Sequence, residues 1–358
     1  MMVATVQTSD AEMVPDRRAV ARRLGIWLVL VVLVMATASL AMGAAGTSLW
    51  LALADLVQGR ALAPVDSAIL WTIRLPRTIM AILVGAALAV SGAVLQGLFR
   101  NPLADPALVG VSSGAALGAI SAIVLGAALP PSIAVVIGPH LIPLAAFAGS
   151  GITIMVLYRI STRAGRTSVA TMLLGGIAIG AMAAAGSGLL IYAADDQQLR
   201  DLNFWQLGSL AGSTWARVGV AAPIILIALT ASPFLARGLN ALALGEAPAA
   251  HLGIPVQRLK TLAVLLVAAA TGAAVAVSGG IGFVGIVVPH LLRLWSGPDH
   301  ATLLPNAALL GASLLLAADI LGRIVIAPAE LPIGIVTAVL GAPVFLWILM
   351  QRRAELAL

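Results

Sequence analysis

The sequence predicts an all-α polytopic membrane protein with ten transmembrane helices per protomer. Of its 358 residues, 61% are hydrophobic and 9% are charged, whereas globular chains carry about a quarter of charged residues. The apolar residues recur in blocks of about 20, which is the length at which a helix crosses the hydrocarbon core of a bilayer. Little polar sequence separates these blocks, so we expect no sizeable soluble domain.

Glycine, proline and charged residues divide the chain into ten apolar blocks. The expected spans cover residues 24–45, 78–98, 108–129, 139–158, 168–193, 217–236, 261–279, 283–295, 303–326 and 333–350. The eighth is short and is bounded by glycines, so we expect it to cross part of the bilayer, which requires protein or a cavity to satisfy its free backbone groups. The first is too long for the apolar core of a signal peptide and is therefore counted as a span.

The expected domain organisation follows from these spans. Residues 1–23 form a cytoplasmic N-terminal tail, residues 24–353 a ten-helix permease domain, and residues 354–358 a C-terminal tail. Residues 237–260 form the longest cytoplasmic loop. A shorter apolar stretch from Leu49 to Val57, interrupted by Asp55, is typical of an interfacial segment.

The distribution of basic residues predicts the orientation. With ten spans both termini lie on one side, and the segments on that side hold 14 of the 20 lysines and arginines, against 6 on the other. Because cytoplasmic segments carry the excess of basic residues, both termini are expected in the cytoplasm. Orientation therefore explains the net charge of +6 better than nucleic-acid binding does.

Small residues recur on single faces of several spans. Gly110, Gly114 and Gly118 lie four apart, as do Gly176 and Gly180. In lipid, where burial of apolar surface supplies no drive between helices, such faces allow neighbouring backbones to approach closely. Either generic tight packing or a rigid body that moves as a unit would produce this pattern.

Cysteine and the motifs needed for nucleotide binding are missing from the sequence. There is no cysteine, and the single lysine, Lys260, does not lie in a phosphate-binding loop. We therefore expect no catalytic residue, no metal site and no permanently bound cofactor, and any ATPase that drives this chain must be another polypeptide. The four histidines are scattered; His290 is typical of helix capping or packing, and His140 is either structural or an axial ligand of an iron porphyrin.

A proton-coupled transporter needs an ionisable group within the membrane. Asp319 is the only carboxylate inside a long span, and Arg323 follows four residues later. At that spacing a same-face ion pair is the simplest explanation. A pump that lacks both an ion-coupling centre and an ATPase needs a partner.

Two loop motifs offer surfaces for partners. In the loop over 237–260, a glycine-bounded alanine and leucine pattern predicts short helices lying across the membrane face, although a plain connector remains an alternative. On the outer side, Arg74 and Arg77 flank Leu75-Pro76 and are expected to project together. Such a pair can bind carboxylates bidentately, or its side chains can simply extend to the interface.

These motifs and others in the same order resemble the membrane permeases of bacterial type II ABC importers, which carry cobalamin, ferric siderophores and heme. The resemblance runs from about residue 65 to the C-terminus. The matching segments are Arg74–Arg77, Gly92–Gly97, Asn101–Gly114, Leu244–Gly253, Gly280–His290 and Glu330–Phe345.

The resemblance implies a homodimer in the bacterial inner membrane with two cytoplasmic ABC ATPase subunits, which bind Mg-ATP, and a periplasmic substrate-binding protein. Arg74, Arg77 and Arg323 match outer arginines that meet glutamates of the binding protein. A cytoplasmic segment matches the coupling helices that seat in the ATPase cleft. Its residues are Gly245, Glu246, Ala247, Pro248, Ala249, Ala250, His251, Leu252 and Gly253.

The resemblance also implies a gated pathway at the dimer axis, used by alternating access and lined chiefly by spans three, five, eight and ten. Asn101 and Leu103 match positions that narrow its cytoplasmic end. The second gate element, polar in the cobalamin branch, is here Ser168, Val169 and Ala170, which implies a more apolar constriction.

The apolar wall favours a flat hydrophobic macrocycle, and the chain is most similar to the heme-importing members. We therefore expect heme as the cargo, with a ferric siderophore or cobalamin as alternatives. Two alternative functions belong to other classes of protein: a channel that works without an ATPase, and a membrane scaffold without a transport role.

Overall fold

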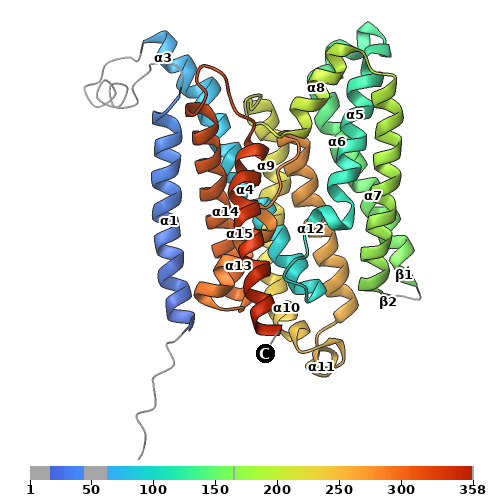
Figure 1. Cartoon of the computed structure of the whole chain (residues 1–358), viewed down its shortest axis with the longest axis vertical. Coiled ribbons are helices and arrows are strands. Elements are labelled where there is room, and N and C mark those ends of the chain that lie inside the picture. The colour runs from blue at the N-terminus through green and yellow to red at the C-terminus, as the bar shows by residue number, and fades with distance from the viewer. Residues whose placement is uncertain (1–16, 44–62, 164–165, 357–358) are drawn as a thin grey trace, which may run out of the picture.

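The computed structural model describes residues 17–43, 63–163 and 166–356, and these residues form a bundle of helices (Figure 1). The long helices are α1 (Arg17–Ala41), α4 (Leu75–Phe99), α5 (Val111–Leu125), α6 (Pro131–Ser161), α7 (Val169–Tyr192), α9 (Trp215–Ala231), α12 (Val256–Ser278), α13 (Val284–Ser296), α14 (His300–Ile324) and α15 (Ile333–Leu356). The shorter elements are α3 (Pro64–Ala68), the π-helical η1 (Ile69–Arg74), the 3₁₀ segments η2 (Pro106–Val109), η3 (Gly126–Ala128) and η4 (Ser232–Leu235), α8 (Asp196–Gln206), α10 (Ala236–Ala243), α11 (Glu246–His251), and the antiparallel strands β1 (Thr162–Arg163) and β2 (Arg166–Thr167).

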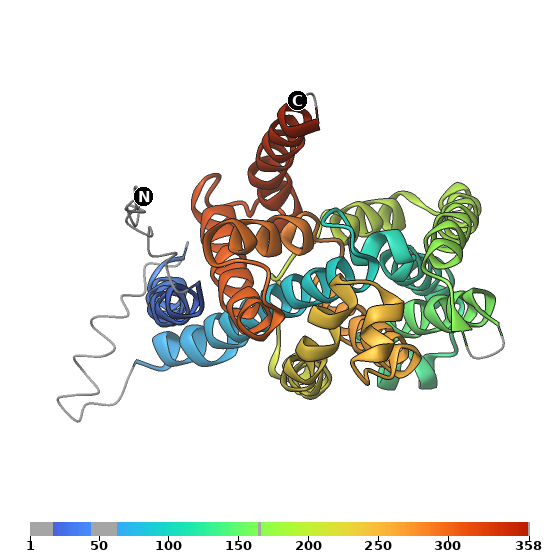
Figure 2. The same ribbon diagram turned by 90° about the horizontal axis from the view of Figure 1, so that it is seen from below.

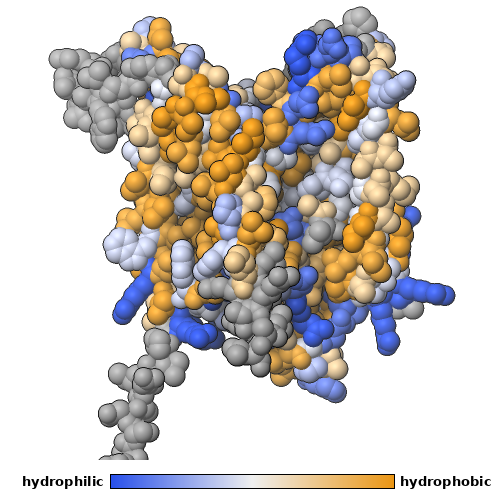
Figure 3. Space-filling model, viewed as in Figure 1, coloured by the Kyte–Doolittle hydropathy of each residue, from blue (hydrophilic) through white to orange (hydrophobic). Residues whose placement is uncertain are grey.

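The described residues confirm the predicted fold class. Seven helices are long and apolar enough to cross a membrane, and α5, α13 and α15 are shorter apolar helices at the remaining expected positions. On the face shown in Figure 3, hydrophobic residues form a broad band, with hydrophilic residues gathered toward the two ends. The short eighth span is α13, which glycines bound on both sides as the sequence indicated.

Helix α4 is the most buried of the long helices. It packs against α14, α13, α12 and α9, whereas α1 lies at the edge of the bundle and α15 projects away from the other helices (Figure 2). A Cβ atom at Gly92 of α4 would lie 1.9 Å from the carbonyl oxygen of Gly285, and one at Gly85 would lie 2.3 Å from that of Gly311. The central helix therefore meets α13 and α14 backbone to backbone.

The predicted small-residue face of α5 has the same effect. A Cβ atom at Gly118 would lie 2.1 Å from the carbonyl oxygen of Ala145 in α6, and one at Gly114 would lie 2.5 Å from that of Gly149. Close approach of the α5 and α6 backbones is thus possible only because these positions carry no side chain.

Several expected boundaries were wrong, including the start of α12, which begins at Val256 and not at residue 261. Helix α1 begins at Arg17, and α6 begins at Pro131 because Pro130 and Pro131 start the helix and Gly138-Pro139 does not interrupt it. The motif from Arg74 to Arg77 is helical and not a loop, because the π-helical turn η1 leads directly into α4 and Pro76 lies in the first turn, where a missing N–H is tolerated. The expected interfacial stretch from Leu49 to Val57 and residues 1–16 lie outside the described residues.

The two ends of the bundle carry different elements. Helix α1 begins and α15 ends at the end that also carries α10, α11 and the β1–β2 hairpin, here named the α11 end (Figure 1). The opposite end, named the α8 end, carries α3 and α8. Because α1 begins and α15 ends at the same end of the bundle, the arrangement agrees with an even number of membrane crossings. The assignment of the α11 end to the cytoplasm stays a prediction.

Substitution of Gly92 by alanine should destabilise the bundle, because the added methyl group would force α4 away from Gly285. Overpacking of this kind costs roughly 1–3 kcal/mol, which thermal unfolding in detergent would register as a lower midpoint. Gly219→Ala on α9, where a Cβ meets nothing within 4 Å, is the matched control. Equal midpoints for both variants would contradict the close α4–α13 contact.

Candidate functional site

Arg77, predicted to face a partner, lies in a buried ion-pair network at the α8 end. Its Nε atom lies 2.9 Å from Asp319 Oδ1, and its Nη1 atom lies 2.8 Å from Glu330 Oε1. Asp319 is fully buried, and its second carboxylate oxygen lies 2.9 Å from Arg323 Nη2. The predicted same-face pair of Asp319 and Arg323 is therefore confirmed, and it extends to α4 through Arg77.

Arg74 and Arg323 also hold the C-terminal end of α1. Arg74 Nη1 donates to the carbonyl oxygens of Leu40 and Ala41 at 2.6 and 3.2 Å. Arg323 Nη1 donates to those of Ser39 and Met42 at 3.1 and 3.0 Å. The last carbonyls of a helix have no partner within the helix, and cations are favoured there. The two arginines therefore cap α1 and fix it to α4 and α14.

The three arginines are thus close together, as the docking hypothesis requires, but their side chains point inward. All three are buried, whereas Glu330 is 40% exposed. Arg74 and Arg77 do not project from the surface as the loop interpretation supposed, because the π-helical turn places them on a helix face that packs against α1 and α14. A role in docking stays a prediction.

The predicted coupling segment forms a separate short helix at the α11 end. Gly245 and Gly253 bracket α11 with φ of +117° and +80°, a region that glycine adopts without strain. Ala249 is fully buried and anchors the helix, whereas Leu244 and Leu252 are 67% and 59% exposed. The segment therefore presents apolar side chains outward at the α11 end of the bundle.

The predicted gate residues lie in two separate turns. Asn101 and Leu103 follow α4, where Asn101 Oδ1 accepts from the Leu103 N–H at 3.0 Å. Ser168 caps α7 by accepting from the Thr171 N–H at 3.2 Å, and Ala170 is exposed in the first turn. Within the described part of the chain, no hydrogen bond or ion pair joins the two turns, so a single protomer leaves them unconnected.

A cavity of about 220 Å³ lies between α4, α8, α12 and the segment before α13. Asp105, Ser112, Gln206 and Thr271 contribute polar side chains to its wall. Asp105 also accepts from the Ala107 N–H at 2.8 Å, which fixes the turn after α4. The cavity is small and belongs to one protomer.

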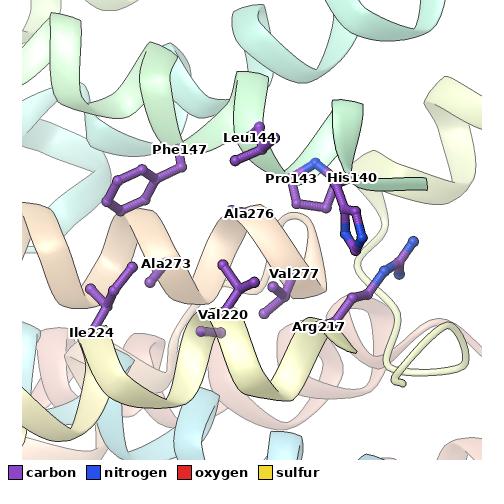
Figure 4. Close-up of a pocket in the computed structure, with 11 residues that line it drawn as sticks. His140, Pro143, Leu144, Phe147, Arg217, Val220, Ile224, Ala273, Ala276 and Val277 are labelled. Carbon is purple, nitrogen blue, oxygen red and sulfur yellow. The ribbon is translucent and has the colours of Figure 1, made fainter. Parts of the chain in front are cut away.

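A larger cavity of about 380 Å³ lies between α6, α9 and α12 and is almost entirely apolar. His140 and Arg217 lie beside each other at one end of it, and Phe147 and Ile224 line the other (Figure 4). The axial-ligand alternative for His140 stays a prediction. In the described residues no group of three or more His, Asp or Glu side chains could hold a metal ion.

A polar cluster at the α11 end was missed by the sequence reading. Asp299 caps α14, accepting from the Ala301 N–H at 3.0 Å and from Asn240 Nδ2 at 2.7 Å, and lies 3.4 Å from Arg18 Nε. The backbone hydrogen bond from Ala301, with the amide of Asn240 and the charge of Arg18, holds the pKa of Asp299 below its ordinary value. An aspartate directly before a long apolar helix, as Asp299 is here, is typical of a helix N-cap and could have predicted this contact.

Comparison with known proteins relates residues 29–351 to the FecCD transport family. The hemin transport system permease protein HmuU of Yersinia pestis is 47% identical over 283 residues, which are 79% of this chain and 83% of that protein. The vitamin B12 import system permease protein BtuC of Shigella boydii is 42% identical over 327 residues, 91% of this chain and 95% of that protein.

Among solved structures, an inward-facing metal-chelate type ABC transporter has a TM-score of 0.80 at 32% identity and covers 92% of this chain and 99% of its own. The structure of PsaBC from Streptococcus pneumoniae in complex with Fab has a TM-score of 0.52 at 18% identity, covering 79% of this chain and 92% of that one, and shares the fold.

Replacing Asp319 by asparagine should severely destabilise the bundle, because two buried guanidinium groups would lose their shared counter-ion. Breaking a buried pair by removing one partner costs roughly 3–5 kcal/mol. The measurement is the thermal unfolding midpoint in detergent, with Asp201→Asn on the exposed face of α8 as the control. A variant as stable as the control would show that the network does not hold α4, α14 and α1 together.

Proposed function

This chain belongs to the FecCD transport family as a permease of a type II ABC importer, and we propose that its cargo is heme. The cargo assignment depends chiefly on one observation, the absence of charge along the exposed face of α7. Helix α7 carries no Asp, Glu, Lys or Arg, and Leu174, Met182, Leu189 and Tyr192 are exposed along it. An apolar wall of this kind suits a flat hydrophobic macrocycle and binds it weakly enough to release it.

The similar proteins are named for two different cargoes, hemin and vitamin B12, and experiment can distinguish between them. The similarity to a hemin permease supports heme, and the similarity to vitamin B12 permeases supports cobalamin as an alternative. A ferric siderophore is a further alternative and would favour more hydrogen-bonding side chains in the spans. The run from Ser168 to Ala170, with one hydroxyl among three residues, favours the apolar cargo.

The proposed assembly is a homodimer with two ABC ATPase subunits and a periplasmic binding protein. Exposed apolar side chains on α7 and on α15, among them Val339, Leu346 and Trp347, support a face that a second copy covers, with the pathway between the two protomers. The exposed Leu244 and Leu252 beside α11 support seating of that helix in a groove of the ATPase.

Binding-protein docking at the α8 end draws support from the exposed edge of the ion-pair network. Arg77 and Arg323 share the buried Asp319, and Arg77 also pairs with the partly exposed Glu330, whereas Arg74 interacts with Asp66. An incoming carboxylate would compete with Glu330 for Arg77, because that pair lies at the exposed edge of the network. Charge-assisted hydrogen bonds of this type are among the stronger ones in proteins.

The proposed mechanism is alternating access. The binding protein delivers cargo at the α8 end, ATP binding closes the ATPases, and α11 transmits that closure to the helices that bear the gate residues. Because the two gate turns are unconnected within one protomer, a second protomer would complete the constriction. Rigid-body movement of helices is the ordinary way in which such transitions proceed.

The test is uptake into liposomes that contain the permease–ATPase complex with its purified binding protein. We expect ATP-dependent accumulation of heme and little accumulation of cobalamin or of a ferric siderophore. Accumulation of either alternative without heme would refute the cargo assignment while leaving the permease assignment intact.

Liposomes that contain this chain alone test the alternative that the protein is a channel that needs no ATPase. We expect neither transport nor ATP hydrolysis from them, since the sequence carries no nucleotide-binding loop. Cargo flux through the isolated chain would show that the ATPase is not required.

A further inference from the structure

The only lysine of the chain, Lys260, is buried in the first turns of α12 at the α11 end. Its side chain is 3% exposed, and its Nζ atom has two partners from different parts of the sequence. It donates to Glu246 Oε1 at 2.8 Å and to the carbonyl oxygen of Thr167 at 2.8 Å. A buried ammonium group held in this way joins the two partners through a single atom.

The first partner belongs to the helix proposed to meet the ATPase. Glu246 is the first residue of α11 and directly follows Gly245. The Glu246 carboxylate is 47% exposed, so it keeps part of its contact with water while it pairs with Lys260. Movement of α11 would therefore displace the carboxylate to which the ammonium group is bound.

The second partner adjoins the proposed gate. Thr167 ends β2 and immediately precedes Ser168, which caps α7. Both peptide groups of Thr167 are held by α12, because its N–H donates to Gln257 Oε1 at 2.8 Å and its carbonyl accepts from Lys260. The start of α7 is thus fixed to α12 at the point where Lys260 also holds α11.

We propose that Lys260 is a positioning residue that couples α11 to the start of α7, so that displacement of the coupling helix is passed to the gate residues 168–170. The inference rests on the proposed function, since it assumes that α11 meets an ATPase. The geometry supports this role because the two acceptors of the ammonium group lie on two segments that the mechanism requires to move together.

The direct test measures whether the two segments move as one. Because the chain has no cysteine, Ala170→Cys and Ala250→Cys introduce two unique labelling sites, both at exposed positions. The labelled permease is mixed with an excess of unlabelled chain, so that an assembled complex carries labels on one protomer, and it is compared by pulsed electron resonance without nucleotide and with vanadate-trapped Mg-ATP. We expect one narrow distance distribution common to both states, and with Lys260→Met a distance that differs between them.

Lys260→Met is suited to this test because it removes the charge while keeping a similar apolar volume. Removing one partner of a fully buried ion pair is costly, but the partner left behind here, Glu246, has a half-exposed side chain and stays hydrated. Arg258→Met, an exposed cation on the same helix, is the matched control and should behave as the unsubstituted chain. Lys260→Arg retains the donors and should restore the common distance.

The functional readout is the amount of heme imported per ATP hydrolysed. Coupling between sites commonly amounts to 5–150-fold, and we expect this ratio to fall at least about fivefold in Lys260→Met but not in Arg258→Met. A Lys260→Met variant with a lower unfolding midpoint but an unchanged ratio and unchanged distances would overturn the proposal, because the lysine would then be only structural.

Failure of the proposal and failure of the proposed function give different results. The distance measurement needs no cargo, so it reports on the link even if heme is not the substrate. If the unsubstituted complex imports nothing, the cargo assignment fails, whereas a normal import ratio in Lys260→Met refutes the coupling role alone.

Discussion

Direct backbone contact between α4 and its neighbours is the constraint on which the rest of the structure depends. Gly92 and Gly85 admit the carbonyl groups of Gly285 and Gly311, and α4 can lie at the centre of the bundle for that reason. Its first turn then places Arg77 against Asp319, and its last turn leads into the turn that holds Asn101. Elements at both ends of the proposed pathway are therefore positioned by one helix.

Charge serves in this protein mainly to join helices to one another. At the α8 end, Asp319 is shared by guanidinium groups from α4 and α14, and at the α11 end Lys260 is shared by α11 and the start of α7. Between the two ends, the exposed face of α7 is uncharged. A wall without fixed charges suits a permease that must release what it accepts, whereas the buried ion pairs join helices at the two ends of the bundle.

The periodicity and length of the apolar blocks predicted ten apolar helices, seven of which are long enough to cross a membrane, because the length of a membrane helix is set by the bilayer and not by tertiary packing. Side-chain direction was less predictable. The Arg74–Arg77 motif looked like a loop because Pro76 usually ends helices, and a π-helical turn cannot be recognised from residue types. Helix α8 was missed although Asp195 and Gln198 have the spacing of a capping box. The two roles of Lys260 depend on residues 14 and 93 positions away, which no local pattern connects.

The way in which Arg74 and Arg323 grip the end of α1 has a consequence for how this helix can evolve. Apart from one hydrogen bond to the Ser39 hydroxyl, they bind main-chain oxygens, which every amino acid supplies. At this end, attachment of α1 therefore places few demands on its side chains, provided that the helix stays apolar and ends at the same point. Most substitutions in the last turn of α1 would consequently leave these main-chain contacts in place.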